Sequence, residues 1–237
     1  MKIMTTGFSA ICLLGIGATV NGDVLFTQSF ENPDDTGGQY VDATVDGGSF
    51  DHDLINYEGL SAVDGEGFDA TFISNGPSQV GLTDGDFVGV TAYTGGGSPG
   101  GFTDGSQGYQ LSDIDGIMVL TLSAVAGADS VSLDFWLNST GYETTEPNVD
   151  FLTITAGGEL GIDTTGSDID DLGIEGEWTT LTWTGLTDSE VVIIFSSNSG
   201  TETLMIDNVV WSGEAIPAPG TLALLGLAGI AARRRRA

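Results

Sequence analysis

The sequence contains very few basic residues. Its 237 residues hold 5 Lys and Arg against 34 Asp and Glu, which gives a formal charge of −29. Lys2 stands near one end and four arginines stand at 233–236, so residues 3–232 contain neither Lys nor Arg. Because phosphate contacts need basic side chains, a nucleic-acid partner is excluded. Mutual repulsion of the acids must be screened by salt or offset by bound cations, unless the acidity serves solubility alone.

Cysteine and histidine are each represented once, by Cys12 and His52. One cysteine cannot form an internal disulfide, and this pair cannot complete a tetrahedral zinc site. A serine triad would have to rely on His52, which lies between Asp51 and Asp53 and is interpreted as a turn residue bonded to its neighbours. The alternative interpretation is that the flanking carboxylates raise the pKa of His52 or that His52 shares a metal ion with them. We therefore expect no catalysis, although chemistry by paired carboxylates stays open.

The first 22 residues have the pattern of a secretory signal peptide. Lys2 is followed by an apolar run over residues 8–20, and Cys12 lies inside that run. Cleavage after Gly22 would place Val20 and Gly22 at positions −3 and −1 and begin the mature chain at Asp23. The alternative is a buried first strand. The pattern predicts an exported protein.

Residues 215–237 have the pattern of a short membrane anchor. A Pro-Ala-Pro step leads into an apolar run over residues 221–232, and the arginines follow. As a helix this run would span about 18 Å of the roughly 30 Å of hydrocarbon, with the arginines held on the cytoplasmic side. The sequence therefore predicts a short transmembrane helix, with an ordinary tail anchor as the alternative interpretation of the segment.

This tail resembles PEP-CTERM sorting signals, which exosortase-type transpeptidases process in Gram-negative bacteria. The resemblance covers residues 216–237, and Ala218 stands where that family has a glutamate. It implies an exosortase-type enzyme as a partner and a place in the cell envelope. The residues that carry it are Pro217, Ala218, Pro219, Arg233, Arg234, Arg235 and Arg236.

Residues 23–214 show the pattern of strands and turns. In residues 130–138 the side chains of Val131, Leu133, Phe135 and Leu137 share one face. Comparable runs occupy residues 24–30, 87–93, 117–125, 149–156, 178–186, 191–195 and 203–211. These segments predict an all-β fold, an acidic antiparallel β-sandwich of the jelly-roll kind. Residues 95–108 are expected to form a long mobile loop, and residues 185–189 a hairpin turn.

Two short segments resemble the first and last strands of jelly-roll carbohydrate-binding modules and galactose-binding-like folds. They are FTQSFENP, which contains Glu31, and ETLMIDNVV, which contains Asp207. In such folds these strands are neighbours, and an acid at the end of each contributes to a structural calcium site. The resemblance implies Ca²⁺ at Glu31 and Asp207, and the alternative is two solvated acids.

Other groups of acids could also supply oxygen ligands to calcium. The densest group departs from the EF-hand pattern at Leu172 and Thr179 and, like Asp113 with Asp115, is interpreted as a solvated turn. Glu143, followed by Asp150, is a further possible oxygen site beside a long loop. The densest group consists of Asp168, Asp170, Asp171, Glu175 and Glu177.

Aromatic side chains suggest where a sugar could bind. Trp136 points away from the core set of its strand, and Tyr142 is close in sequence, so both are candidates for stacking on a sugar. The alternative for Trp136 is burial under a loop. Trp183 shares its face with Leu181 and is expected in the core.

Together these patterns predict an exported, non-catalytic glycan-binding or adhesion module of the bacterial envelope or matrix, with structural calcium and extracellular polysaccharide as a partner. A purely structural envelope or biofilm protein and a hydrolase that uses carboxylates alone are the alternatives.

Overall fold

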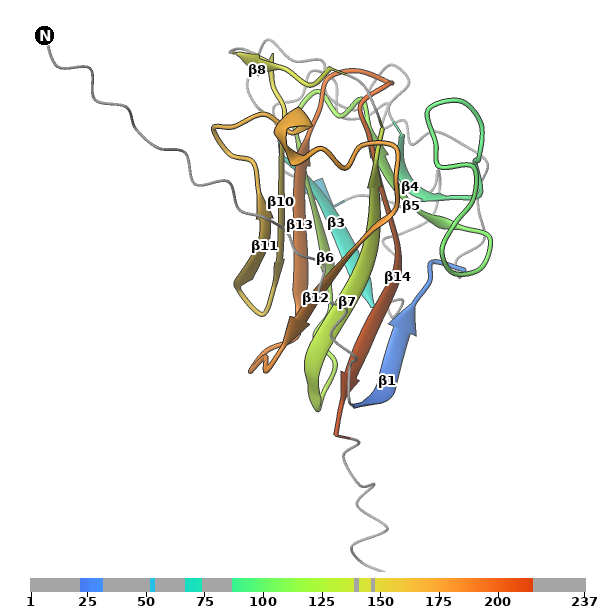
Figure 1. Ribbon diagram of the computed structural model, residues 1–237, viewed down its shortest axis with the longest axis vertical. Helices are drawn as coiled ribbons and strands as arrows, with labels where there is room; N and C mark the ends of the chain where they lie inside the picture. Colours follow the sequence, from blue (N-terminus) through green and yellow to red (C-terminus); the bar gives the residue numbers. More distant parts are fainter. Residues whose placement is uncertain are drawn as a thin grey trace, which may run out of the picture.

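The structure is a computed structural model and describes residues 22–31, 52–53, 67–73, 87–138, 141–145 and 148–214. These residues form two facing antiparallel β-sheets with almost no helix, which confirms the all-β prediction (Figure 1). No helix in these ranges is long and apolar enough to cross a membrane. The predicted signal peptide, apart from Gly22, and the sorting residues Pro217, Ala218, Pro219 and 233–236 lie outside the described residues.

The first sheet has six strands, and its long central strand is β14. The order across it is β12, β7, β14, β5, β4, while β1 pairs with the C-terminal half of β14. The bounds are β1 Asp23–Gln28, β4 Phe87–Thr91, β5 Gly108–Ser112, β7 Ala128–Leu137, β12 Thr179–Thr184 and β14 Thr203–Gly213.

The second sheet also has six strands, in the order β11, β10, β13, β6, β3, β2. Its bounds are β2 His52–Asp53, β3 Phe68–Ile73, β6 Ile117–Leu122, β10 Phe151–Ala156, β11 Glu159–Asp163 and β13 Val191–Ser196. A two-stranded ribbon of β8 (Thr144–Thr145) and β9 (Asn148–Val149) and the short 3-10 helix η1 (Asp170–Leu172) lie outside the two sheets.

The core lies between the sheets and is built by alternation along the strands. In β7 the predicted inward set is at most 1 % exposed, and in β13 Val191, Ile193 and Phe195 are fully buried. Burial of each such side chain contributes about 1.5–3 kcal/mol. Phe30, Phe68 and Tyr109 add a group of aromatic rings with centroids 5.3–5.6 Å apart, which ties the end of β1 into the core.

The segment predicted as a hairpin turn is a crossover between the sheets. Residues 185–189 leave β12, which pairs with β7, and enter β13, which pairs with β10 and β6. The indole N–H of Trp211 donates to the Ser189 carbonyl at 2.8 Å, and the Val125 N–H donates to Ser189 Oγ at 2.9 Å. The hairpin prediction was wrong because turn residues show that the chain reverses, not which strand it then pairs with.

Candidate functional site

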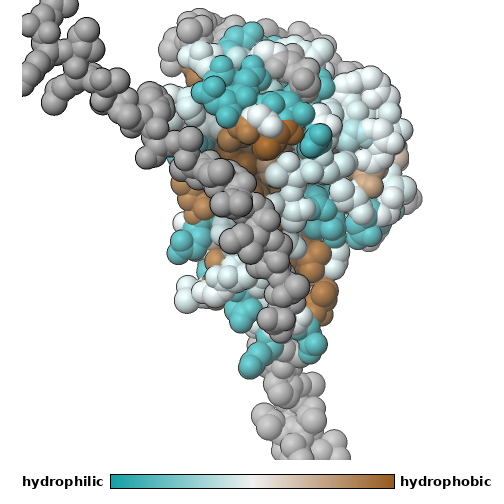
Figure 2. All heavy atoms as spheres, viewed as in Figure 1, coloured by the Kyte–Doolittle hydropathy of each residue, from teal (hydrophilic) through white to brown (hydrophobic). Residues whose placement is uncertain are grey.

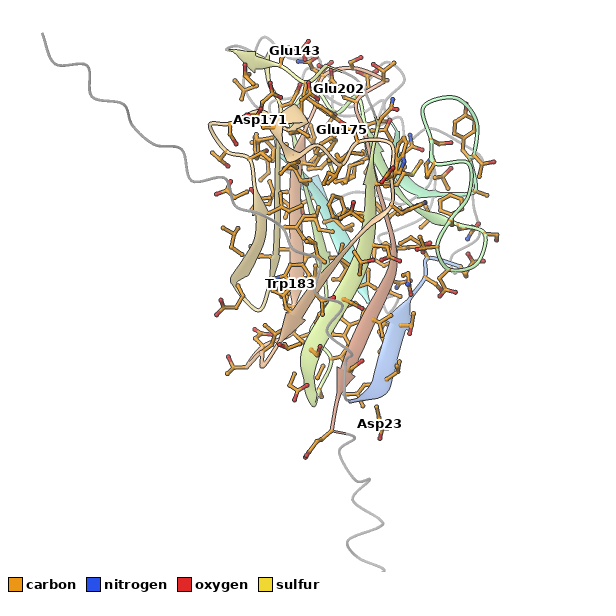
Figure 3. The ribbon with its side chains drawn as sticks, in the orientation of Figure 1. Asp23, Glu143, Asp171, Glu175, Trp183 and Glu202 are labelled. Atoms are coloured by element: carbon orange, nitrogen blue, oxygen red, sulfur yellow. The ribbon has the colours of Figure 1, made fainter. Side chains whose placement is uncertain are left out.

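Three carboxylates from distant parts of the chain meet at one end of the sandwich. Glu143 precedes β8, Asp150 lies between β9 and β10, and Glu202 precedes β14. One carboxylate oxygen of each lies within 4.8 Å of the others, and we call these residues the carboxylate cluster. Figure 3 shows Glu143 and Glu202 at the upper end of the molecule, where Figure 2 shows hydrophilic residues gathered.

Backbone hydrogen bonds position the carboxylate cluster. The Glu143 N–H donates to Asp150 Oδ2 at 2.6 Å, and the Asp150 N–H donates to the Glu143 carbonyl at 2.8 Å. Glu202 Oε2 accepts from the Asn198 N–H at 2.8 Å, and the Glu202 N–H donates to the Ser199 carbonyl at 2.9 Å. Hydrogen bonds within residues 143–150 and within residues 198–202 thus fix the backbone of each segment. Each segment supplies acidic side chains to the cluster.

The electrostatics of the cluster are unusual because two of its members are buried. Asp150 and Glu202 are each 2 % exposed, whereas Glu143 is exposed. Burial raises the pKa of both buried carboxyls, and the charges of neighbouring carboxylates add to the rise. The residues that the structure describes include no Lys or Arg, so none of them can neutralise either carboxyl as a basic partner. The cluster therefore needs a proton or a bound cation.

Tyr142 lies beside this cluster and adds a neutral hydroxyl. Its side chain is 6 % exposed, and its hydroxyl donates to the Asn138 carbonyl at 3.3 Å. Burial, followed by the charges of Glu202 and Asp150, raises the pKa of this phenol far above its ordinary value. Tyr142 is therefore buried, and its ring is not open for the predicted stacking on a sugar.

The densest acidic stretch of the sequence lies at the same end but does not enter the cluster. Asp168 Oδ1 accepts from the Asp170 N–H at 3.0 Å, which forms the local turn that begins η1. Burial and the charge of Asp168 raise the pKa of Asp170. Figure 3 places Asp171 and Glu175 just below Glu143 and Glu202. These acids add negative potential to this end of the molecule.

The two predicted calcium ligands, Glu31 and Asp207, are brought to the same loop, residues 95–107. Asp207 is fully buried, and its Oδ2 accepts from Thr103 N–H at 2.7 Å, Thr103 Oγ1 at 3.0 Å and Asp104 N–H at 2.8 Å. Burial raises the pKa of Asp207 to about 6, although these donors oppose the rise. The carboxylate thus holds the loop against β14.

Glu31 holds the other end of this loop. Its Oε1 accepts from the N–H groups of Ser106 at 2.6 Å and Gln107 at 2.7 Å. Burial would raise the pKa of Glu31, but these donors outweigh it and lower the pKa. Gly105 has a φ of +71°, and a Cβ there would overlap the Glu31 carboxylate. Because both acids already accept hydrogen bonds from loop donors, calcium at this pair stays a prediction.

Trp136 is buried, at 5 % exposure, so the predicted sugar platform has no open ring here. It lies on the expected outward face of β7, opposite Met205 of β14, and both are buried outside the main core cluster. The alternative interpretation, burial, describes Trp136. The sequence alternation predicted which face of β7 carries Trp136. It did not predict that other residues cover this outward face.

The structure also places the remaining tryptophans, His52 and one acid that the sequence did not single out. Trp183 is in the core at 8 % exposure, as predicted, and Trp178 donates its indole N–H to the Gly101 carbonyl at 3.0 Å. The interpretation of His52 as a turn residue was wrong, because His52 belongs to strand β2, where it pairs with Phe72; its side chain is outside the described part of the structure. Glu202 was not among the predicted site residues, because no local motif marks it.

Comparison with known proteins identifies no family. No protein-family model matches the sequence, and no curated protein is significantly similar to it. Among solved structures, the secreted serine protease VesC from Vibrio cholerae matches with 10 % identity and a TM-score of 0.32, over 50 % of this chain and 24 % of its own. The present chain thus spans about a quarter of that protein.

Two smaller domains show likenesses of similar strength. The K2 cleaved adhesin domain of Lys-gingipain matches at 15 % identity and a TM-score of 0.34, over 79 % of this chain and 97 % of its own. TmCBM61 in complex with β-1,4-galactotriose matches at 14 % identity and a TM-score of 0.31, over 54 % and 82 %. At these TM-scores the likenesses decide neither family nor function.

Proposed function

We propose that this chain is an exported, surface-sorted, non-catalytic adhesion or glycan-binding module of a Gram-negative cell envelope or extracellular matrix. Its jelly-roll sandwich is stabilised by a calcium ion, and its tail is a substrate of an exosortase-type enzyme. The observation that carries the calcium part is the carboxylate cluster, in which Asp150 and Glu202 are 2 % exposed and close to Glu143.

Calcium suits this cluster for chemical reasons. Ca²⁺ takes six to eight hard oxygen ligands, and carboxylates supply one or two each. A divalent cation would relieve the repulsion among acids that burial has removed from water. The Asp150 and Glu202 side chains come from segments that join different strands, so an ion between them would fasten the end of the second sheet to β14.

The alternative of a carboxylate hydrolase is favoured by one feature, the raised pKa values of Asp150 and Glu202, since a catalytic acid needs such a value. Their 2 % exposure argues for a structural role, because a glycosidic oxygen must reach the acid that protonates it. Turnover of chromogenic glycosides that disappears in Asp150→Asn would favour the hydrolase instead.

Thermal unfolding at low salt tests the calcium part. In about 10 mM CaCl₂ we expect the wild type to melt about 3–10 °C higher than in chelator, as a ligand at about 10–100 times its Kd stabilises by about 1.4–2.7 kcal/mol. Glu202→Gln and Asp150→Asn should lose this shift, and each should melt above the wild type in chelator because a buried charge is gone. Glu190→Gln, an exposed acid outside the cluster, should keep it. Equal melting temperatures of the wild type in calcium and in chelator would remove the ion from the proposal.

A further inference from the structure

The first and last strands of the sandwich begin and end side by side. Asp23 begins β1 and pairs with Gly213, the last residue of β14, and a Cβ at Gly22 would overlap the backbone of Gly213. Figure 1 shows the start of β1 and the end of β14 together at the lower end, and Figure 3 places Asp23 there and Glu202 at the upper end. A pull on the tail, which follows β14, therefore enters the sandwich at the end opposite the carboxylate cluster.

β14 connects these two ends of the sandwich. It begins directly after Glu202 of the carboxylate cluster, and its 11 residues end at Gly213. At a rise of about 3.3 Å per residue, the strand spans about 35 Å. A force between the tail and the opposite end of the sandwich is therefore directed along β14.

β14 is paired on both sides along most of its length. On one side, residues 204–213 pair with β7. On the other side, residues 203–206 pair with β5, and residues 209–213 pair with β1. Because the hydrogen bonds of antiparallel strands lie perpendicular to the strands, a force along β14 loads them together, in shear. Moving β14 lengthwise would require many of these bonds to break at once.

Side chains add to this resistance. The core-facing side chains of β14 are all fully buried, and they are Leu204, Ile206, Val209 and Trp211. The indole N–H of Trp211 also donates to the Ser189 carbonyl at 2.8 Å, in the crossover that leads into the second sheet. Lengthwise motion of β14 would therefore pull apolar side chains through a close-packed core, where displacement is costly.

β1 has the opposite mechanical geometry. Within the ranges that the structure describes, it pairs with β14 alone, and its ladder begins with Asp23 and Gly213 at the lower end. A force that separates Asp23 from Glu214 would open this ladder one pair at a time. The first turn of resistance is small, since Val24 is 64 % exposed. The sandwich therefore has a direction in which it resists force and one in which it yields.

We propose that the sandwich bears tension between its tail and its opposite end, with β14 as the load-bearing strand. This proposal rests on the proposed function, since an adhesion module held by its tail is pulled between its anchor and whatever it binds. It adds a mechanical task to that function. It also gives the calcium ion a second role, because an ion at Glu202 would fasten the upper end of β14 to the segment that carries Asp150.

Single-molecule force spectroscopy of the full chain tests the proposal, in calcium and in chelator. Cys12→Ser removes the native thiol, and pairs of new cysteines at exposed positions serve as handles. Asp171→Cys with Glu214→Cys pulls from opposite ends, whereas Asp23→Cys with Glu214→Cys pulls at one end. We expect the first pair to unfold at a higher force than the force at which the second pair loses β1. Calcium should raise the force of the first pair only.

Two matched truncations separate load on β14 from overall stability. Val209 in β14 and Val191 in β13 are both fully buried. Each change to alanine leaves a cavity, so both variants should melt below the wild type. Only Val209→Ala should lower the unfolding force of the opposite-end pair, because Val191 belongs to a strand of the second sheet that this pull does not load lengthwise against β7.

Equal forces for the two handle pairs would overturn the proposal, as would an equal loss of force in Val209→Ala and Val191→Ala. Neither result touches the proposed function, because thermal unfolding measures the calcium part separately. Forces that differ as expected in a chain whose melting temperature does not respond to calcium would support β14 as the load-bearing strand, while the ion would be lost from the proposed function.

Discussion

Asp150 and Glu202 occupy positions where proteins seldom keep a charge without a partner. Each is almost fully buried, and each accepts a backbone N–H, which satisfies part of the carboxylate but does not neutralise it. Breaking water contacts around two like charges costs several kcal/mol per ion unless a proton or a cation compensates. The cluster is therefore a place where solution conditions control the stability of the fold.

In chelator, we expect the free energy of unfolding to increase as the pH falls from about 8 to about 5. Burial raises the pKa of Asp150 and Glu202 above their ordinary values of 3.8 and 4.5, and that of Asp207 to about 6. A group with a raised folded-state pKa stabilises the fold below its unfolded pKa, and this contribution is lost as the pH rises through the folded value. Melting temperatures measured across this range would show the trend.

Calcium should reverse this dependence, because the ion binds the deprotonated carboxylates. We expect the stabilisation by calcium to be largest near pH 8 and to fade near pH 5. The double variant Asp150→Asn with Glu202→Gln serves as the control and should show a flatter dependence in chelator. A chelated wild type that loses stability between pH 7 and pH 5.5 would contradict the assignment of buried, proton-binding acids.

The sequence predicts two of the three residues of the carboxylate cluster. Glu143 and Asp150 flank one loop and were recognised as a possible oxygen site. Glu202 follows a turn ahead of a strand, as many solvated acids do, and joins them only because β13 and β14 bring the end of one sheet beside the other. Trp136 and Tyr142 are both buried, and neither the strand alternation that gives the face of Trp136 nor the closeness in sequence that suggested Tyr142 shows what covers a side chain.

At the scale of elements, strands with a clear apolar alternation or an apolar run were predictable, whether the structure covers one of their faces or both. The alternation of β7 and β12 predicted both strands and the inward position of Trp183. β5 was not among the predicted strands, because its alternation of Tyr109 and Leu111 with Gln110 and Ser112 is too short to mark a strand. Tyr109 and Leu111 face the core, while on the other face Phe102 of the 95–107 loop lies against Gly108. Partners and sheet order depend on contacts distant in the sequence.

The 95–107 loop, expected to be mobile, is fastened to two strand ends by acids. We expect Asp207→Asn to loosen it, because the loop donors Thr103 and Asp104 lose a charged acceptor, and an amide whose oxygen keeps their bonds turns its nitrogen toward the Asn208 N–H. The fold should lose about 1–3 kcal/mol, and chymotrypsin should cut faster after Phe102. Mass spectrometry of timed digests would measure this rate.

Asp104→Asn is the matched control for this loop, since its backbone N–H, not its side chain, contacts Asp207. It should be cut at the wild-type rate. Equal rates in Asp207→Asn and the wild type would mean that Asp207 does not hold the loop.

At the scale of the whole molecule, charge and destination are linked. All 34 acids lie between Asp23 and Glu214, and Figure 2 shows hydrophilic residues concentrated at the end that carries the cluster. Calcium sites of extracellular modules have Kd values of about 0.1–1 mM, far above the Kd values of cytosolic calcium sensors. A site of this kind would fill only after export, so the sandwich would reach its full stability outside the cytoplasm.

The tail supplies the last prediction, which concerns where the chain is held. We expect replacement of Arg233, Arg234, Arg235 and Arg236 by glutamine to move the protein from the membrane fraction of a Gram-negative host that lacks an exosortase-type enzyme, where the tail stays uncut, into the medium. The apolar run over residues 221–232 is too short to span the bilayer firmly, so the arginines are needed to stop its transfer. Immunoblots of membrane and medium fractions would measure the shift, and a lysine replacement, which keeps the charge, should stay with the membrane. If the glutamine variant stays in the membrane fraction like the wild type, these arginines are not the anchor, and the proposal of a sorted surface protein loses its support at this end of the chain.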